Sequence, residues 1–338
     1  MNVTVNNTAN SSYFGHTSKS LLTLWAACDL SSCIIGSFAS LLVVILILSR
    51  RQLRHGCGLI IVHSLIANLL LCAISFVISC ALLYRKSIGL GAIHPHHCKP
   101  IMWLQMALRC AVNWLEVLIT LNRLIAIYFP HHYRVSSGKR VTAWTVAGVW
   151  LVSALYALPA WFDVGAKYAL TPLGHCAIAV NPDNLGALNN VFGAYLPIAL
   201  TAVCFGVIYG KLVVRKRNPD ARDKSGSVKR RARVIPMLFA AFLWNAACFL
   251  TMPVTLSSSP NVFVTEPALV LLFMTLTVLG YSMQPVIFCV FNKDYRAAFA
   301  SFFNKKSPVG PSEGKSSGNV TRLSATNQPT KTRTSESD

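Results

Sequence analysis

The chain has 338 residues, of which 54% are hydrophobic and 12% charged, and its formal net charge is +20. This composition excludes an ordinary water-soluble protein, because soluble domains carry about 25% charged residues. A basic chain can bind nucleic acid, but here the basic residues border apolar stretches, where anionic lipid is a sufficient partner. We therefore expect a protein that binds membrane lipid and no nucleic acid.

Seven nearly uncharged stretches are each long enough to cross a hydrocarbon core of about 30 Å as a helix. Backbone groups in lipid must be hydrogen-bonded internally, and the alternating segments of about 10 residues that form a β-barrel are absent from the sequence. The sequence therefore predicts an all-α membrane protein, a seven-transmembrane helix bundle. The stretches are 24–49, 58–83, 99–129, 141–161, 189–214, 229–256 and 265–290.

The distribution of Lys and Arg predicts the orientation of the chain. With the N terminus outside, 25 of the 31 basic residues fall on the inner side, which fits the positive-inside tendency. Residues 1–20 are polar and do not resemble a cleavable signal peptide. We expect a multi-pass plasma-membrane protein with an extracellular tail over 1–23, in which Asn2, Asn6 and Asn10 begin glycosylation sequons.

The part of the chain after the seventh stretch differs in composition. Tyr295, Phe299 and Phe302 or Phe303 recur every three to four residues, which predicts a short amphipathic helix on the inner membrane surface. The helical domain is therefore expected to cover 24–303. Residues 304–338 have few large apolar groups and are expected to form a disordered cytoplasmic tail, either phosphorylated or simply solubilising.

The third stretch carries a regular series of polar residues. Steps of three and four residues place them on one helical face. A charge facing lipid near the bilayer centre costs at least about 2.5 kcal/mol, so this face must point into the bundle. We call this series the polar stripe: Gln105, Arg109, Asn113, Glu116, Thr120 and Arg123.

The upper part of the polar stripe offers candidate ligand-binding residues: Gln105, Arg109 and Asn113. Arg109 lies too deep to reach the interface simply by extending its side chain. One interpretation is a cation at the floor of an outward-opening pocket, where it binds a carboxylate or another anion of a small molecule or peptide. The other is a structural ion pair with Glu116 or Asp29. The sequence does not choose between them.

The end of the third stretch reads NRLIAIYFPHHYR and resembles the D-R-Y and I-A-I-x-x-P pattern of rhodopsin-like (class A) G-protein-coupled receptors. SLIANLL in the second stretch is similar to the family's S-L-A-x-A-D-L. QPVIFCVFNKDYRAAF resembles N-P-x-x-Y followed by a surface helix. Prolines fit the fourth, fifth and sixth helices at Pro159, Pro197 and Pro253. Each match is weak alone, but together their order and spacing are specific for this family.

The resemblance implies a receptor that binds an extracellular ligand and activates a heterotrimeric G protein, with arrestin and a receptor kinase as partners of the tail. It implies that Arg123 joins the inner ends of helices three and six at rest and meets the G protein after helix six swings out. It also implies a disulfide between Cys98 and Cys176. The positions matching the family's switch motifs are Asn122, Arg123, Pro253, Gln284, Pro285 and Phe288.

The chain departs from the family pattern at several of these positions. Asn122 replaces the acidic residue before the arginine, and Asn68 replaces the aspartate of helix two. Because Asn122 gives Arg123 no charged neighbour, we expect basal signalling above that of typical relatives. Gln105 stands about where aminergic relatives have aspartate, so amines are not expected as ligands. The combination most resembles divergent invertebrate chemosensory or orphan receptors, including the nematode serpentine type.

A secondary transporter is the alternative function. It would use Arg109 and Glu116 as a substrate or proton relay, and it should show broken helices or duplicated halves, of which the sequence shows no sign. An enzyme is not expected, because no nucleophile, base and orienting group stand together. No cofactor and no metal site are expected.

Overall fold

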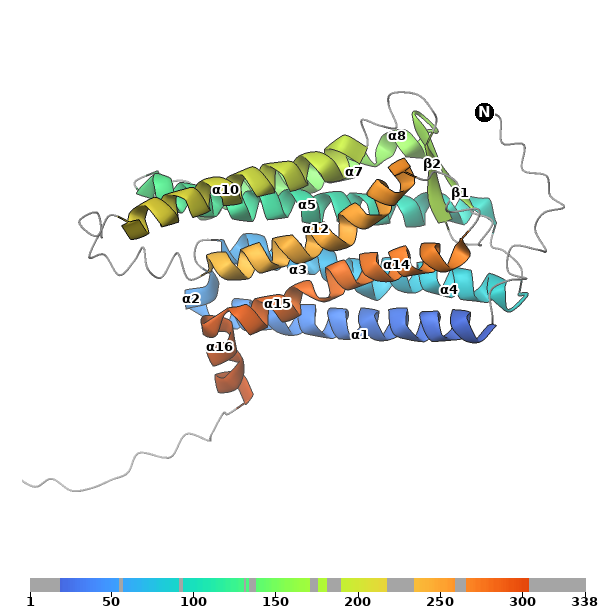
Figure 1. Cartoon of the computed structure of the whole chain (residues 1–338), viewed down its shortest axis with the longest axis horizontal. Helices are drawn as coiled ribbons and strands as arrows, with labels where there is room; N and C mark the ends of the chain where they lie inside the picture. Colours follow the sequence, from blue (N-terminus) through green and yellow to red (C-terminus); the bar gives the residue numbers. More distant parts are fainter. Residues whose placement is uncertain are drawn as a thin grey trace, which may run out of the picture.

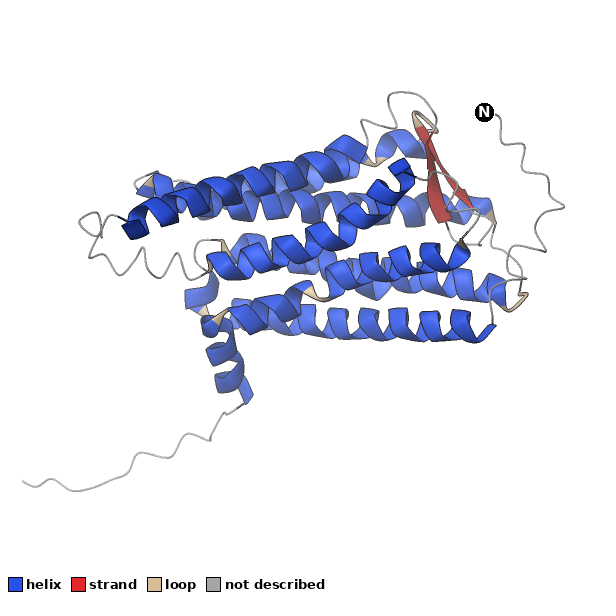
Figure 2. Cartoon of the chain, viewed as in Figure 1, coloured by secondary structure: helices blue, strands red, loops and turns tan. Residues whose placement is uncertain are grey.

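The computed structural model describes nine stretches of the chain and is mostly helical, with one small sheet (Figure 2). The sequons at Asn2, Asn6 and Asn10 and the tail over 304–338 lie outside the described residues. The described residues are 19–54, 57–90, 94–130, 132–133, 138–170, 176–180, 190–217, 234–258 and 266–303.

The helices run side by side along one long axis (Figure 1). The first half of the chain forms α1 (Lys19–Ser49), α2 (Arg51–Arg54), α3 (Gly58–Leu70), the π-helical turn η2 (Leu71–Ser75), α4 (Phe76–Ser87), the 3-10 turn η3 (Pro95–His97) and α5 (Cys98–Tyr128). The second half forms α7 (Lys139–Tyr156), α8 (Leu158–Trp161), the π-helical turn η4 (Val191–Tyr195), α10 (Leu196–Arg217), α12 (Ile235–Ser258), α14 (Pro267–Ser282), α15 (Gln284–Phe291) and α16 (Lys293–Phe303).

Seven membrane crossings result, as the sequence predicts. Among the described residues, six helical segments are long and apolar enough to span a membrane, and α14 with α15 forms a seventh span that is bent by 43°. The bend lies at Met283, and α15 has Pro285 in its first turn. Proline has no N–H to donate to the preceding turn, so a break at this point follows from the sequence.

The two ends of the bundle differ in structure. At one end, called here the hairpin end, lies a two-stranded sheet; at the other, the α16 end, helix α16 leaves the bundle at a steep angle (Figure 1). α16 begins after Asn292, and its buried Tyr295 packs into the main apolar cluster. The amphipathic helix expected after the seventh span is therefore present.

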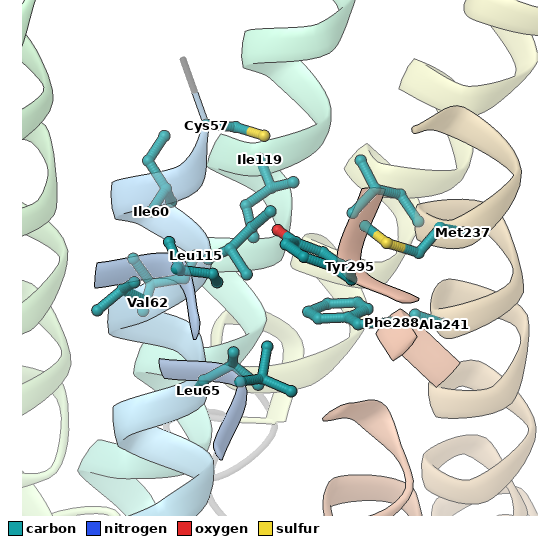
Figure 3. Close-up of a cluster of buried hydrophobic side chains, with 14 of the residues drawn as sticks. Cys57, Ile60, Val62, Leu65, Leu115, Ile119, Met237, Ala241, Phe288 and Tyr295 are labelled. Atoms are coloured by element: carbon teal, nitrogen blue, oxygen red, sulfur yellow. The ribbon is translucent and has the colours of Figure 1, made fainter. Parts of the chain in front are cut away.

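The main apolar cluster occupies the α16 half of the bundle and joins helices that are distant in sequence. Figure 3 shows Leu115 and Ile119 of α5 between side chains of α3 and those of α12, α15 and α16. Burial of each such side chain contributes about 1.5–3 kcal/mol relative to full exposure in water. This cluster fixes the distance of α3 and α5 from the later helices.

Large apolar side chains also cover the outside of the bundle. Ile34 is 67% exposed, Phe38 63% and Trp144 78%. An apolar surface of this extent is unfavourable in water and favourable in the hydrocarbon of a bilayer. The exposed surface and the helix lengths therefore indicate a membrane-embedded bundle.

The strands at the hairpin end were not expected from the sequence, which predicts only a loop over 162–188. β1 (Ala166–Leu170) pairs antiparallel with β2 (Cys176–Val180), and Ala166 lies opposite Val180. The two strands lie across the end of the bundle, beside the start of α5 (Figure 1). They provide a fixed cap over that end of α5.

Candidate ligand and switch sites along α5

α5 is the most buried of the spans. In its apolar stretch 61% is buried inside the bundle, against 22–44% for the other five single-helix spans. It contacts α3, α7 and α10 along its length, and β1 and β2 near its start. Gln105, Asn113 and Thr120 of the polar stripe are buried, and Arg109, Glu116 and Arg123 are partly buried. The polar stripe therefore lies within the bundle, as the cost of charge in lipid requires.

The hairpin is attached to α5 by a covalent bond and by polar contacts. Cys98, the first residue of α5, forms a disulfide with Cys176, the first residue of β2. The next residue, Lys99, pairs with Asp163 at 3.2 Å and donates a hydrogen bond to the Trp161 carbonyl at 3.1 Å. The predicted Cys98–Cys176 bridge is confirmed.

Tyr168 of β1 adds a buried contact beneath the hairpin. Its hydroxyl donates a hydrogen bond to the Ala157 carbonyl at 2.7 Å, and its side chain is 6% exposed. Burial raises the pKa of the Tyr168 hydroxyl to about 12, so the group remains a donor at neutral pH. The hairpin is therefore held against α5 and against the end of α7.

Arg109 lies among aromatic side chains. Its Cζ is 5.4 Å from the centroid of the Phe76 ring, and the Phe76 and Tyr281 rings are 5.7 Å apart. Nε of Arg109 is buried without a hydrogen-bond partner. Within the described part of the chain the one ion pair is Lys99–Asp163, so Arg109 has no carboxylate partner there.

Both carboxylates considered as partners of Arg109 are engaged elsewhere. Asp29 accepts a hydrogen bond from Thr275 at 2.7 Å. Glu116 accepts hydrogen bonds from two amides, described below. The structure therefore disfavours the ion-pair interpretation of Arg109, whose Nε is left without an acceptor.

The other two candidate ligand-binding residues have different surroundings. Gln105 is 6% exposed and lies one turn from Arg109 toward the hairpin end. The side-chain amide of Asn113 donates a hydrogen bond to the Gly193 carbonyl of η4 at 2.7 Å. Arg109 thus faces α4 and α14, whereas Asn113 joins α5 to the start of the fifth span. Arg109 and Asn113 thus share a helix face but contact different helices.

Glu116 connects three helices in the middle of the bundle. Its Oε1 accepts hydrogen bonds from Nδ2 of Asn245 on α12 and from Nε2 of Gln284 on α15, the second at 2.7 Å. Oε1 of Gln284 in turn accepts a hydrogen bond from Nδ2 of Asn68 on α3. The predicted switch residue Gln284 is thus at the centre of a buried amide network.

A small cavity, with room for about one water molecule, lies beside Glu116. Its walls come from α5, α10, α12 and α15 and are mostly apolar, including Phe205 and Phe242, with Glu116, Thr120, Thr201 and Gln284 as polar groups. A drug-sized ligand needs a far larger space, about 300–1,000 Å³. The cavity therefore suits a single water molecule.

Arg123 lies toward the α16 end. Its guanidinium donates a hydrogen bond to Sγ of the buried Cys57, which immediately precedes α3, and its Nε has no partner. The resemblance implies a link from this arginine to helix six, but the contact observed here is to the start of helix two. Asn122 is 7% exposed, and its side-chain oxygen has no hydrogen-bond partner.

The remaining predicted switch residues lie on α12 and α15. Pro253 falls within α12, which continues to Ser258. Pro285 and Phe288 are buried in α15, and Phe288 belongs to the main apolar cluster (Figure 3). The structure therefore brings Gln284 and Phe288 to the cavity beside Glu116, while Arg123 lies nearer the α16 end.

Sequence reasoning missed Asn245 and Cys57 as partners. Asn245 is the one amide in the apolar run IPMLFAAFLWNAACFL, and a polar side chain in a membrane helix is costly unless it is paired. The sequence therefore contains a signal that Asn245 needs a polar partner. No sequence signal singles out Cys57, because its role depends on the approach of α3 to the end of α5.

Comparison with known proteins agrees with this arrangement. A family described as serpentine type 7TM GPCR chemoreceptor Srx matches residues 30–292. Dopamine receptor 4 of Caenorhabditis elegans is 21% identical over 203 residues, which cover 60% of this chain and 39% of that receptor. These comparisons give no support to a transporter. Because the family match covers most of the chain, the protein belongs to the Srx family of serpentine-type seven-transmembrane G-protein-coupled chemoreceptors.

Proposed function

We propose that the protein is a plasma-membrane receptor that binds an anionic small molecule at Arg109 and activates a heterotrimeric G protein at the α16 end. The observation that supports this ligand class is the partly buried guanidinium of Arg109, which has an unpartnered Nε and lies over the Phe76 ring. A carboxylate or phosphate entering from the hairpin end would supply the missing acceptor.

The likeness to a dopamine receptor does not favour dopamine as the ligand of this chain. A protonated amine would be repelled by the guanidinium of Arg109, since like charges in a site of low polarity repel strongly. Gln105, one turn toward the hairpin end, is uncharged. The charge of the polar stripe therefore favours an anion.

The α16 end has the features that a G protein and anionic lipid would use. Basic residues concentrate there, from Arg50, Arg51 and Arg54 at one connection to Lys139 and Arg140 at another. The hairpin end then faces outward and the tail inward, as the positive-inside tendency favours. An epitope tag before residue 1 should bind antibody on intact cells, and a tag after residue 338 only on permeabilised cells.

The role proposed for Arg123 is to hold the resting state through Cys57 and to contact the G protein after rearrangement. Cys57 is uncharged, so this contact lacks the Coulomb attraction of an arginine–carboxylate pair. Arrestin and a receptor kinase are the partners proposed for the tail over 304–338. The transporter hypothesis has no supporting observation and is not pursued.

The ligand class is tested by screening small carboxylic and phosphoric acids on cells that express the wild type, with second-messenger level as the readout. Active acids are then applied to Arg109→Ala and Arg109→Lys. We expect potency to fall by at least 100-fold in Arg109→Ala and less in Arg109→Lys, which retains the charge.

The matched control is Lys99→Ala, which removes a basic residue of α5 that is already paired with Asp163. Potency should stay within about threefold of the wild type, because a partly exposed ion pair contributes little free energy. Equal potency on the wild type and Arg109→Ala would contradict the proposed anion site.

A further inference from the structure

The fourth span ends in a turn that presents two apolar side chains. The span covers Lys139–Trp161, that is α7 and α8, and the turn is formed by residues 162–165, just before β1. Within the turn Phe162 is 70% exposed and Val164 is 51% exposed. Large apolar side chains that stand out from the end of a helix are unfavourable in water, so this turn needs an apolar neighbour.

Backbone hydrogen bonds fix the shape of the turn. The N–H of Val164 donates to the Pro159 carbonyl at 2.9 Å, and the N–H of Asp163 donates to the Ala160 carbonyl at 3.4 Å. This pair of bonds ends many helices, and it places one residue in the left-handed region, where glycine is usual. Here that residue is Asp163, with a φ of 59°, and its carboxylate pairs with Lys99 of α5 at 3.2 Å. The turn is therefore held in one conformation.

Phe162 continues the outward face of the fourth span. Leu155 lies four residues after Leu151, and Phe162 lies seven residues after Leu155, which places all three on one helical face. Each of them is more than half exposed. Trp144, seven residues before Leu151, extends the same face toward the α16 end. The exposed turn is thus an extension of a surface that lies against lipid.

The length of the fourth span places the turn at the edge of the bilayer. Its 23 residues cover about 34 Å, at about 1.5 Å per residue, and the hydrocarbon core is about 30 Å thick. Lys139 and Arg140 begin the span, and basic side chains at the end of a span extend to the headgroups. Trp161 then reaches the opposite headgroup boundary, where tryptophan is enriched in membrane proteins. The two side chains that follow it are within reach of acyl chains.

Lipid fits this surface better than a second copy of the chain does. Membrane helices pack closely where small residues let two backbones approach, whereas Trp144, Leu151 and Phe162 are bulky and stand out from this face. The charge nearest the turn is also compensated, because Asp163 is paired with Lys99. An unpaired carboxylate would oppose insertion of the turn into lipid.

We propose that Phe162 and Val164 insert into the leaflet at the hairpin end and anchor the β1–β2 hairpin on the membrane. β1 begins at Ala166, two residues after Val164, so an anchor at the turn restricts the strand that follows it. The disulfide to α5 holds β2, and the anchor holds β1. The proposal requires only that the bundle spans a bilayer, and it does not depend on the proposed ligand or on a G protein.

The first test measures the surroundings of a spin label at position 162 in phosphatidylcholine nanodiscs. The label is attached to Phe162→Cys in a Cys28→Ser background, because the exposed Cys28 would also react. We expect the label to collide more with oxygen, which concentrates in lipid, than with a water-soluble nickel chelate. Leu155→Cys should show the same order. Lys167→Cys, at an exposed position of β1, should show the reverse order.

Two results of this test would overturn the anchor. A label at position 162 that collides more with the nickel chelate would show that the turn lies in water. A label that collides little with either reagent would show that protein, such as a second copy of the chain, covers the turn.

The second test measures hydrogen–deuterium exchange over 166–170 in the same nanodiscs. In the double variant Phe162→Ser and Val164→Ser, exchange should be faster than in the wild type by about threefold or more, because the strand has lost its anchor. Leu90→Ser is the matched control, since it removes an exposed apolar side chain beyond the end of α4, and it should leave exchange over 166–170 unchanged. Unchanged exchange in the double variant would contradict anchoring of the hairpin.

Discussion

The guanidinium of Arg109 lies over the ring of Phe76, with Cζ 5.4 Å from the ring centroid, and not beside a carboxylate. A cation–aromatic contact of this kind contributes about 0.5–2 kcal/mol, which is less than the cost of removing a charge from water. Arg109 is therefore an energetically unfavourable residue in the ligand-free protein, which fits its proposed role in binding an anion.

This imbalance predicts that Arg109→Met stabilises the ligand-free receptor while it abolishes the response to acids. Methionine has a similar length and needs no hydrogen-bond partner, so the melting temperature in detergent should rise by several degrees. Arg109→Lys should not raise it, because the charge remains. A melting temperature that falls in Arg109→Met would show that the guanidinium has a stabilising partner in the resting protein.

Loss of the disulfide should loosen the cap over α5. The bond closes a loop between residues 78 positions apart, and removal of such a bond typically costs about 2–4 kcal/mol. We expect Cys98→Ser or Cys176→Ser to lower both the melting temperature and the amount of receptor at the cell surface. Cys28→Ser, at an exposed free cysteine of α1, is the control and should change neither.

Tyr168 should make the stability of the receptor depend on alkaline pH. Its pKa is about 12 in the folded protein, against an ordinary value of about 10, so the folded state holds a proton that the unfolded state has lost between these values. Stability is therefore full below pH 10 and decreases as pH rises from 10 to 12. Melting temperatures measured across pH 9–12 should fall more steeply for the wild type than for Tyr168→Phe. Parallel curves would exclude Tyr168 as the cause.

Asn122 should influence the level of basal signalling. Its buried side-chain oxygen has no partner, and a carboxylate at this position would stand next to Arg123. Asn122→Asp is expected to favour the resting state and to reduce basal second-messenger levels severalfold. The conservative change Asn122→Ser introduces no charge and should not reduce them. An unchanged basal level in Asn122→Asp would argue that Arg123 is already fully held by Cys57.

Most of the helix bundle could be predicted from the sequence, because length and hydropathy determine a membrane span with little help from tertiary packing. The third span, expected over 99–129, is Cys98–Tyr128 in the structure. The hairpin could not be predicted: AKYAL and CAIAV are short and rich in alanine, which gives no clear alternation of apolar and polar residues.

The candidate site could be predicted only in part. Helical spacing placed the polar stripe inside the bundle, since that inference needs one helix and the cost of charge in lipid. The partners of Arg109, Glu116 and Arg123 could not be predicted, because Phe76, Asn245 and Cys57 reach them from other helices. Such contacts depend on how helices rotate and cross, which no local pattern determines.

The central claim is that this receptor activates a G protein through the α16 end of α5. The most direct measurement is nucleotide exchange on purified heterotrimeric G proteins of each main class, mixed with purified receptor in lipid nanodiscs. We expect the wild type to accelerate exchange for at least one G-protein class. Arg123→Ala, compared at the same amount of folded receptor, should lose most of that increase. The claim would be contradicted if the wild-type receptor accelerated exchange on no G-protein class. It would also be contradicted if Arg123→Ala accelerated exchange as much as the wild type does.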